Sequence, residues 1–172
     1  MPEQSRDDIA KEDALYKPFT LKRLTDFNPG EQSEPGAGKL ITGNQLKEDV
    51  FDNIDMLFNS RSHASLADLK GYEDVEQSVL GYGVHDFCGR QSSTSSRESL
   101  RDHIFTQVRF FEPRLDPESI NVVFRDNSGK DQSSLEFRIS GYIKVKEVNE
   151  EIAFISRLNL ESGTADLRLD IK

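Results

Sequence analysis

The sequence has no tryptophan, one cysteine and no long apolar run, and each of these absences excludes a class of protein. A single cysteine, Cys88, cannot form an internal disulfide framework or a multi-cysteine metal site. No run approaches the roughly 20 apolar residues that a membrane-spanning helix needs. With no Trp and only four Tyr, the chain also offers few aromatic platforms for sugar rings.

Basic residues are scarce relative to acidic ones. The 172 residues include 22 Lys and Arg against 31 Asp and Glu, which gives a formal net charge of −9. Proteins that bind nucleic acid or anionic membranes need a cationic surface, so this balance argues against both partners. The opening residues contain no apolar stretch of the kind found in secretory signals, and we expect a soluble cytoplasmic protein.

The apolar pattern predicts one folded domain over residues 17–172 after a flexible tail over residues 1–16. The tail is dense in charge and poor in apolar residues, so it could not bury enough surface to offset the entropy of ordering. An apolar patch over residues 15–27 suggests a short helix docked on the core. Residues 60–95 are less regular, with one short helix expected around residues 75–80.

Two longer amphipathic helices are predicted ahead of a sheet. The first spans about residues 43–59, where apolar residues recur at helical spacing and Thr42 with Gln45 has capping-box spacing. The second begins near Ser95, which also has capping-box spacing to a Glu, and Pro113 ends it. We expect the polar residues of the first helix to take its solvent side; these are Asp49, Asp52, Asn53 and Asp55.

After Pro113 the apolar period changes from helical to alternating, which predicts about four strands. The longest alternating run is at residues 135–146, and shorter runs lie at 120–124, 152–160 and 165–171. Two turn signals stand between the predicted strands, Asn127-Ser128-Gly129 and Ser162-Gly163. One face of each strand is apolar and the other is charged, as in antiparallel sheets covered on one side. The fold class that follows is α+β, with amphipathic helices packed on one face of a mainly antiparallel sheet of about four strands.

Three short patterns could carry chemistry, and each has a simpler explanation. The Gly-Tyr-Gly run at 81–83 begins like a dinucleotide fingerprint, but Asp86 occupies the third glycine position and no strand precedes it. His85 and Cys88 are close in sequence, yet loop residues three apart have no enforced geometry for a nucleophile. The three histidines share no ligand spacing, and we expect His103 on the polar side of its helix, so we predict no catalytic, metal or cofactor site.

The tetrapeptide Glu112-Pro113-Arg114-Leu115 stands at the junction of the second helix and the sheet. The proline ends the helix and pushes the preceding residue toward extended geometry, so an acid and a guanidinium are presented from rigid backbone. Arginine offers a planar fork that can bind a carboxylate through two hydrogen bonds. Taken alone, the chemistry favours a structural role, in which Arg114 pairs within the chain or satisfies the last carbonyls of the helix.

The last alternating run, at residues 165–171, also has two interpretations. If this strand lies at the edge of the sheet, its free N–H and C=O groups can pair with a strand of another chain. The charged residues interleaved along it are also what protects an edge strand from such pairing.

Four motifs of the chain occur in an order that resembles a known family. They are Arg23-Leu24-Thr25-Asp26, Leu57-Phe58-Asn59-Ser60-Arg61, Ser78-Val79-Leu80-Gly81-Tyr82-Gly83-Val84-His85-Asp86 and Glu112-Pro113-Arg114-Leu115. Together they resemble the type VI secretion baseplate subunit TssE, a relative of a tailed-phage baseplate wedge protein that is often labelled lysozyme-like. The resemblance covers roughly residues 18–172, and the tetrapeptide after the long helix is its most specific part.

The resemblance implies a structural role and no enzyme activity. The protein would link the wedge core to the first sheath ring and help to start sheath polymerisation, in a cytoplasmic baseplate assembled near the inner membrane. Its partners would be the wedge subunits TssF and TssG, with TssK, and the sheath subunits TssB and TssC. By position, Glu112, Pro113 and Arg114 would attach it to the wedge, and an edge of the sheet would face the sheath.

Two alternatives remain open at the level of the residues. A peptidoglycan hydrolase needs two carboxylates at a defined separation across a cleft, and a chain with 31 acids has many candidate pairs. A small regulatory adaptor outside any injection machine is the second alternative.

Overall fold

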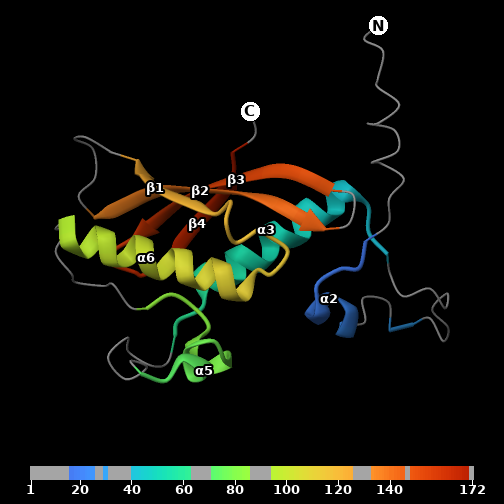
Figure 1. The fold of residues 1–172 in the computed structure, drawn as a ribbon, viewed down its shortest axis with the longest axis horizontal. Coiled ribbons are helices and arrows are strands. Elements are labelled where there is room, and N and C mark those ends of the chain that lie inside the picture. Colours follow the sequence, from blue (N-terminus) through green and yellow to red (C-terminus); the bar gives the residue numbers. More distant parts are fainter. Residues whose placement is uncertain are drawn as a thin grey trace, which may run out of the picture.

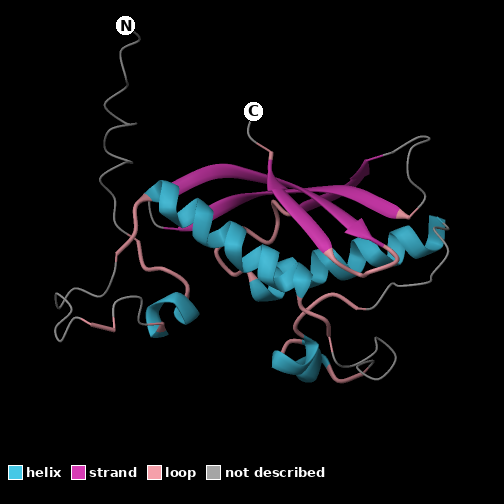
Figure 2. Cartoon of the chain, turned by 180° about the vertical axis from the view of Figure 1, so that it is seen from behind, coloured by secondary structure: helices cyan, strands magenta, loops and turns pink. Residues whose placement is uncertain are grey.

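The computed structural model describes residues 16–25, 29–30, 40–62, 71–85, 94–125, 133–145 and 148–170. Within these ranges the elements are α2 (Thr20–Leu24), α3 (Gly43–Asn59), α5 (Glu73–Glu76), the 3₁₀ turn η1 (Val79–Gly81), α6 (Thr94–Phe111), β1 (Asn121–Arg125), β2 (Ser134–Val145), β3 (Val148–Asn159) and β4 (Ala165–Leu169). Figure 1 shows α3 and α6 beneath one face of the sheet, and Figure 2 shows the same two layers from behind. The predicted α+β class is confirmed.

The four strands pair in chain order, β1-β2-β3-β4, and each neighbouring pair is antiparallel. The sheet is therefore a meander with β1 and β4 at its edges. In the β3–β4 turn, Asn159 Oδ1 accepts the backbone N–H groups of Glu161 at 2.8 Å and Ser162 at 3.1 Å, and Gly163 has a φ of 69°. The structure confirms the turn at Ser162-Gly163, and residues 127–129 lie outside the described residues.

The inward face of the sheet and the apolar stripes of α3 and α6 form one core. Its buried side chains include Leu46, Val50, Ile54 and Leu57 of α3, Leu100, Ile104 and Val108 of α6, and Phe137, Ile139, Ile143 and Phe154 of the sheet. The ring of Phe137 meets those of Phe58 and Phe124 edge-on, with centroids 5.8 and 6.1 Å apart. Burial of each such side chain stabilises the fold by about 1.5–3 kcal/mol, so the core holds the helix layer to the sheet.

Local chemistry sets the ends of the long helices. Thr42 Oγ1 accepts the N–H of Gln45 at 3.4 Å, and Gln45 Oε1 accepts the N–H of Thr42 at 2.9 Å, so the predicted capping box of α3 is confirmed. The α6 helix begins at Thr94, so Ser95 lies inside it and the prediction that Ser95 is the N-cap is wrong. Pro113 follows two residues after the end of α6, as predicted.

The packed part of the chain begins no later than Tyr16. This residue is buried and exchanges two backbone hydrogen bonds of 2.8 Å with Ile41. Residues 1–15, the rest of the expected tail, lie outside the described residues. The short helix predicted here is α2, but it buries no residue, and its Leu21 and Leu24 are exposed.

The face of the sheet away from α3 and α6 carries a row of alternating charges across all four strands. The register pairs Arg125 with Glu136, Glu136 with Arg157, and Arg157 with Asp166. The Glu136 carboxylate lies 3.6 Å from the Arg125 guanidinium and 3.7 Å from that of Arg157. Opposite charges facing each other across strands contribute about 0.2–1 kcal/mol per pair, and here they also keep the uncovered face polar.

None of the helices in the described ranges combines the length and apolarity needed to cross a membrane.

Candidate functional site

The tetrapeptide at residues 112–115 forms the turn that joins α6 to the sheet. The N–H of Glu112 closes the last turn of α6 by donating to Val108 O at 3.0 Å. On the far side of the turn, the N–H of Lys144 in β2 donates to Arg114 O at 2.8 Å. Backbone hydrogen bonds to a helix and to a strand therefore hold the turn from both ends.

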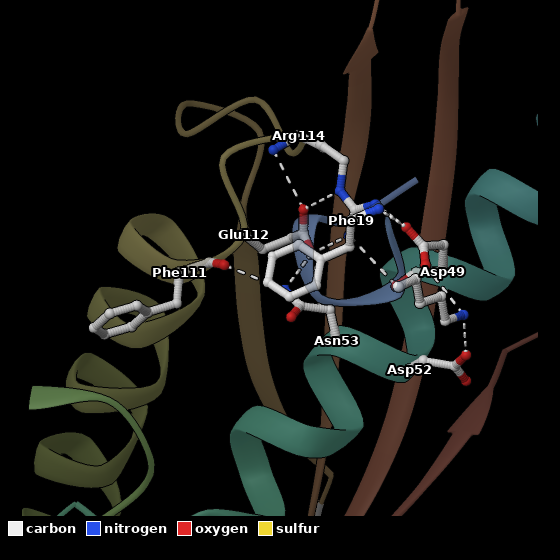
Figure 3. Close-up of polar contacts among 8 residues, drawn as sticks. Phe19, Asp49, Asp52, Asn53, Phe111, Glu112 and Arg114 are labelled. Atoms are coloured by element: carbon white, nitrogen blue, oxygen red, sulfur yellow. Dashed lines mark hydrogen bonds and ion pairs between the residues drawn. The ribbon is translucent and has the colours of Figure 1, made fainter. Parts of the chain in front are cut away.

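Figure 3 shows Arg114 between the carboxylates of Glu112 and Asp49. Arg114 Nε donates to Glu112 Oε1 at 2.6 Å and its Nη2 donates to Glu112 Oε2 at 2.8 Å, which makes a bidentate pair. Its Nη1 donates to Asp49 Oδ2 at 2.5 Å. Asn53 Nδ2 donates to Glu112 Oε2 at 2.7 Å and to Phe111 O at 3.2 Å. The network ties the middle of α3 to the end of α6.

The segment that contains α2 covers this network. The N–H of Phe19 donates to Asp49 Oδ2 at 2.7 Å, and the Phe19 ring centroid lies 5.7 Å from Arg114 Cζ, within the range of a cation–π contact. Lys22 Nζ lies 3.0 Å from Asp49 Oδ1 and 2.5 Å from Asp52 Oδ2. Because α2 buries no side chain of its own, these contacts are its main attachment to α3.

The charges of the network are buried and compensate one another. Glu112 is 0% exposed and Asp49 2%, while the side chain of Arg114 is 14% exposed. Burial alone would raise the pKa of Asp49, but hydrogen bonds from the Phe19 N–H, Arg114 and Lys22 hold that pKa below its usual value. Burial would likewise lower the pKa of Arg114, and the carboxylates of Glu112 and Asp49 instead raise it above its usual value.

The structure brings Glu112 and Arg114 together and leaves Pro113 exposed. Within this chain the geometry is that of the structural interpretation, in which Arg114 pairs internally. The prediction that Asp49 and Asn53 lie on the solvent side of α3 is wrong, because each is only 2% exposed. The sequence signal that could have found them is their i, i+4 spacing, with each residue immediately before a core residue of the apolar stripe.

A second polar cluster joins α6 to the segment after η1. His103 is 5% exposed, so the prediction that it lies on the polar side of its helix is wrong. Its ring stacks on that of His85 with centroids 4.1 Å apart, and its Nε2 accepts the His85 N–H at 3.3 Å, as in a neutral imidazole. Burial, and next the neighbouring His85, lower the pKa of His103 to about 3. Cys88 and His63, the other candidates, lie outside the described residues.

The part of the chain that the structure describes contains no group of three or more His, Cys, Asp and Glu residues arranged to hold a metal ion. The run at 81–83, which begins like a dinucleotide fingerprint, lies in η1 and the segment that follows it, and no named strand precedes it among the described residues.

The Arg114 network ties α3 to the end of α6, and the turn beside it is fixed between a helix and a strand. A sequence model of the family described as Baseplate wedge protein gp25 matches residues 44–148, more than half of the chain, including all but the first residue of α3, the whole of α6 and the turn at 112–115. The chain belongs to this family, whose members are structural proteins of the baseplate in contractile injection machines. A comparison with curated proteins finds no match, and neither does a comparison with solved structures.

Proposed function

We propose that the chain is the TssE-type wedge component of a type VI secretion machine. In this role it links the wedge core to the first sheath ring and helps to start sheath polymerisation. Its wedge partners are TssF and TssG, with TssK in the same cytoplasmic baseplate near the inner membrane, and its sheath partners are TssB and TssC. The observation that carries the proposal is the Glu-Pro-Arg turn, held rigidly between α6 and β2 in a chain of the baseplate wedge family.

The burial of the turn divides its three residues into two roles. Glu112 has no exposed surface, so in this proposal it orients the guanidinium of Arg114 and does not itself reach the wedge. Pro113 is exposed and Arg114 keeps an exposed margin. We therefore assign the wedge contact to Pro113 and to the exposed part of the Arg114 side chain, with Phe19 beside them.

The test places a charge on the surface of the turn. Pro113→Glu should lower co-purification with co-expressed TssF and TssG at least about tenfold, because a charge buried at an interface without a partner is costly. Pro29→Glu is the matched control, since Pro29 is also exposed but lies far from the turn in sequence. Both variants should melt close to the wild-type temperature. Unchanged co-purification of a folded Pro113→Glu protein would remove the turn from the wedge contact.

The sheath contact is assigned to the edge of β4 around Leu169; at the other end of the strand the outward N–H of Ala165 already donates to Asn59 Oδ1 of α3 at 3.2 Å. The N–H of Asp170 donates inward to Ala153 O in β3 at 2.8 Å, and because N–H groups alternate along a strand, that of Leu169 points to the open edge. Leu169→Pro deletes this donor and leaves the ladder to β3 intact, since proline is tolerated on an edge strand. It should abolish sheath foci in cells, whereas Leu169→Ala, which keeps the N–H, should leave them. Normal sheaths with Leu169→Pro would contradict strand addition at β4.

The choice of machine has its own test in the gene neighbourhood. Neighbouring genes for TssB, TssC and TssK homologues support the type VI assignment. Neighbouring genes for phage capsid and tail-tube proteins would place the chain in a phage tail instead.

A further inference from the structure

Residues 72–83, here named the acidic knob, carry three exposed large apolar side chains. Val79 is 88% exposed, Tyr72 64% and Leu80 59%. Figure 1 shows α5, which begins the knob, standing off the helix layer on the side away from the sheet. Single exposed apolar residues are ordinary, whereas several on one short segment are a feature that interaction surfaces share. Neither the Glu-Pro-Arg turn nor the edge of β4 includes any of them.

The backbone beneath these side chains is held in place. Gln107 of α6, itself 1% exposed, donates from Nε2 to Gly81 O at 2.9 Å and accepts the N–H of Gly83 at Oε1 at 3.1 Å. Gly81 packs so closely on Glu76 that a Cβ would lie 1.9 Å from the Glu76 carbonyl oxygen. The N–H of Leu80 also bonds to Ser78 Oγ at 3.3 Å. An apolar tip on fixed backbone loses little conformational freedom on binding.

The charge of the knob indicates the chemistry of its partner. Glu73, Asp74 and Glu76 lie in α5, and residues 72–83 contain no Lys or Arg. A complementary surface therefore carries basic groups around an apolar centre. A second copy of the chain would bring like charge against like charge, and an anionic membrane surface would repel the same three acids.

We propose that the acidic knob inserts Val79 and Leu80 into an apolar groove of a protein partner whose rim carries Lys or Arg residues. The two side chains are the buried anchors, and the three acids of α5 pair with the rim and fix the orientation. This combination of a central apolar anchor and a polar surround is the arrangement of binding hot spots. The surface is separate from the turn and from β4, so it adds a contact to the proposed function and does not depend on it.

Photo-crosslinking from the tip of the knob tests this proposal. A photoreactive amino acid is placed at Val79, or at Val123 of β1 as a control that is 51% exposed, in cells that express the chain with its neighbouring genes. The proposal predicts an adduct from Val79 with one protein, at an apolar site flanked by Lys or Arg. The double change Glu73→Lys and Asp74→Lys should lower the yield of that adduct at least about fivefold and leave any Val123 adduct unchanged.

Binding of the purified pair completes the test. The double change Val79→Ser and Leu80→Ser should weaken binding at least about tenfold while the circular dichroism spectrum stays that of the wild type, because both side chains are exposed. Absence of a Val79 adduct overturns the proposal. An adduct whose yield is the same with and without the Glu73→Lys and Asp74→Lys changes also overturns it. Unchanged co-purification of Pro113→Glu with the wedge subunits would count against the wedge contact and would not affect the crosslinking result at the knob. The two proposals can therefore fail separately.

Discussion

A polar residue next to an apolar stripe can face solvent or a partner from a distant segment, and α3 contains both cases. The side chain of Asp52 is 54% exposed, whereas Asp49 is buried because Arg114 meets it from 65 positions further along the chain. Hydrophobic periodicity separates apolar from polar positions and carries no information about such a long-range partner. For this reason the sequence pattern predicts solvent-facing positions for Asp49, Asn53 and His103, although it does predict the internal pairing of Arg114 in the Glu-Pro-Arg turn.

The Asp49 carboxylate should be a large contributor to stability at neutral pH. Asp49→Asn leaves the buried Arg114 with only one carboxylate, and we expect it to lower the free energy of unfolding by about 3 kcal/mol at pH 7. Because the folded pKa of Asp49 is below its usual 3.8, this stabilisation is present above about pH 4 and is lost as pH falls through the lowered pKa. Urea unfolding at pH 7 and below pH 4 would measure the free energy of unfolding of the wild type and of Asp49→Asn. The difference between the two proteins should be smaller at the acidic pH.

Asp52→Asn is the control for that measurement. Asp52 also pairs with Lys22, but its exposed ion pair should contribute less than about 1 kcal/mol at either pH. Equal losses in the two variants would contradict a special role for the buried carboxylate.

The buried His103 should make the fold sensitive to mild acid. In the unfolded chain it takes up a proton near its usual pKa of 6.5, whereas the folded pKa is about 3. Between these two pKa values, the free energy of unfolding falls by about 1.4 kcal/mol for each unit by which the pH is lowered. His103→Gln cannot titrate, so its stability relative to the wild type should rise as urea unfolding is compared at pH 7, 6 and 5, by about half that slope from pH 7 to 6 and close to the full slope from pH 6 to 5. Parallel stability curves for the two proteins would contradict the low pKa.

At the scale of elements, the features with a clear period were predictable and those set by tertiary contact were not. The α3 helix, its capping box and the alternating strands follow from spacings of 3.6 and 2. The short α5 and η1 lack enough residues to show a period, so the one short helix predicted around residues 75–80 is in fact two pieces, and Gln107 of α6 holds the backbone at the end of the second. Gly81 illustrates the limit, because the sequence suggests only a helix break while the structure shows that it must lack a side chain.

Gly81→Ala should therefore disturb the acidic knob. Its Cβ would lie 1.9 Å from the carbonyl oxygen of Glu76, so backbone must move, at a cost of about 1–3 kcal/mol in the free energy of unfolding. Gly30→Ala is a matched control, since a Cβ there meets nothing within 4 Å, and it should be close to neutral. Thermal melting would compare the two, and hydrogen exchange should localise the Gly81→Ala effect to residues 72–83. Equal melting temperatures would contradict the tight packing.

At the scale of the whole molecule, the sequence predicted the two layers and left the register open. One apolar face per strand requires a sheet covered on one side, and chain-order pairing is the simplest antiparallel topology. The charge row across β1, β2, β3 and β4 depends on how the strands are aligned, which follows from turn geometry that the alternation does not encode. The family match adds the assembly to which this two-layered chain belongs.

Glu136 is the residue on which the charge row depends. Glu136→Lys would place three basic groups in adjacent strands, and we expect a loss of about 1–2 kcal/mol at low salt, partly recovered at high salt because exposed charges are screened. Glu136→Gln, which removes the attraction without adding repulsion, should lose less and depend less on salt. Urea unfolding at two ionic strengths would measure both, and a salt-independent loss in Glu136→Lys would contradict an electrostatic cause.

The order of the elements along the chain also has a consequence for biosynthesis. Both long helices precede the whole sheet, so the ribosome releases their apolar stripes before it has made the strands that cover them. At the usual elongation rate of about 5–20 residues per second, the nascent helices wait several seconds for β4. During that interval the brace between Asp49 and Arg114 can already close, because its members end with the turn after α6. The ion pair is thus available to hold the two helices together in the nascent chain before their hydrophobic partner exists.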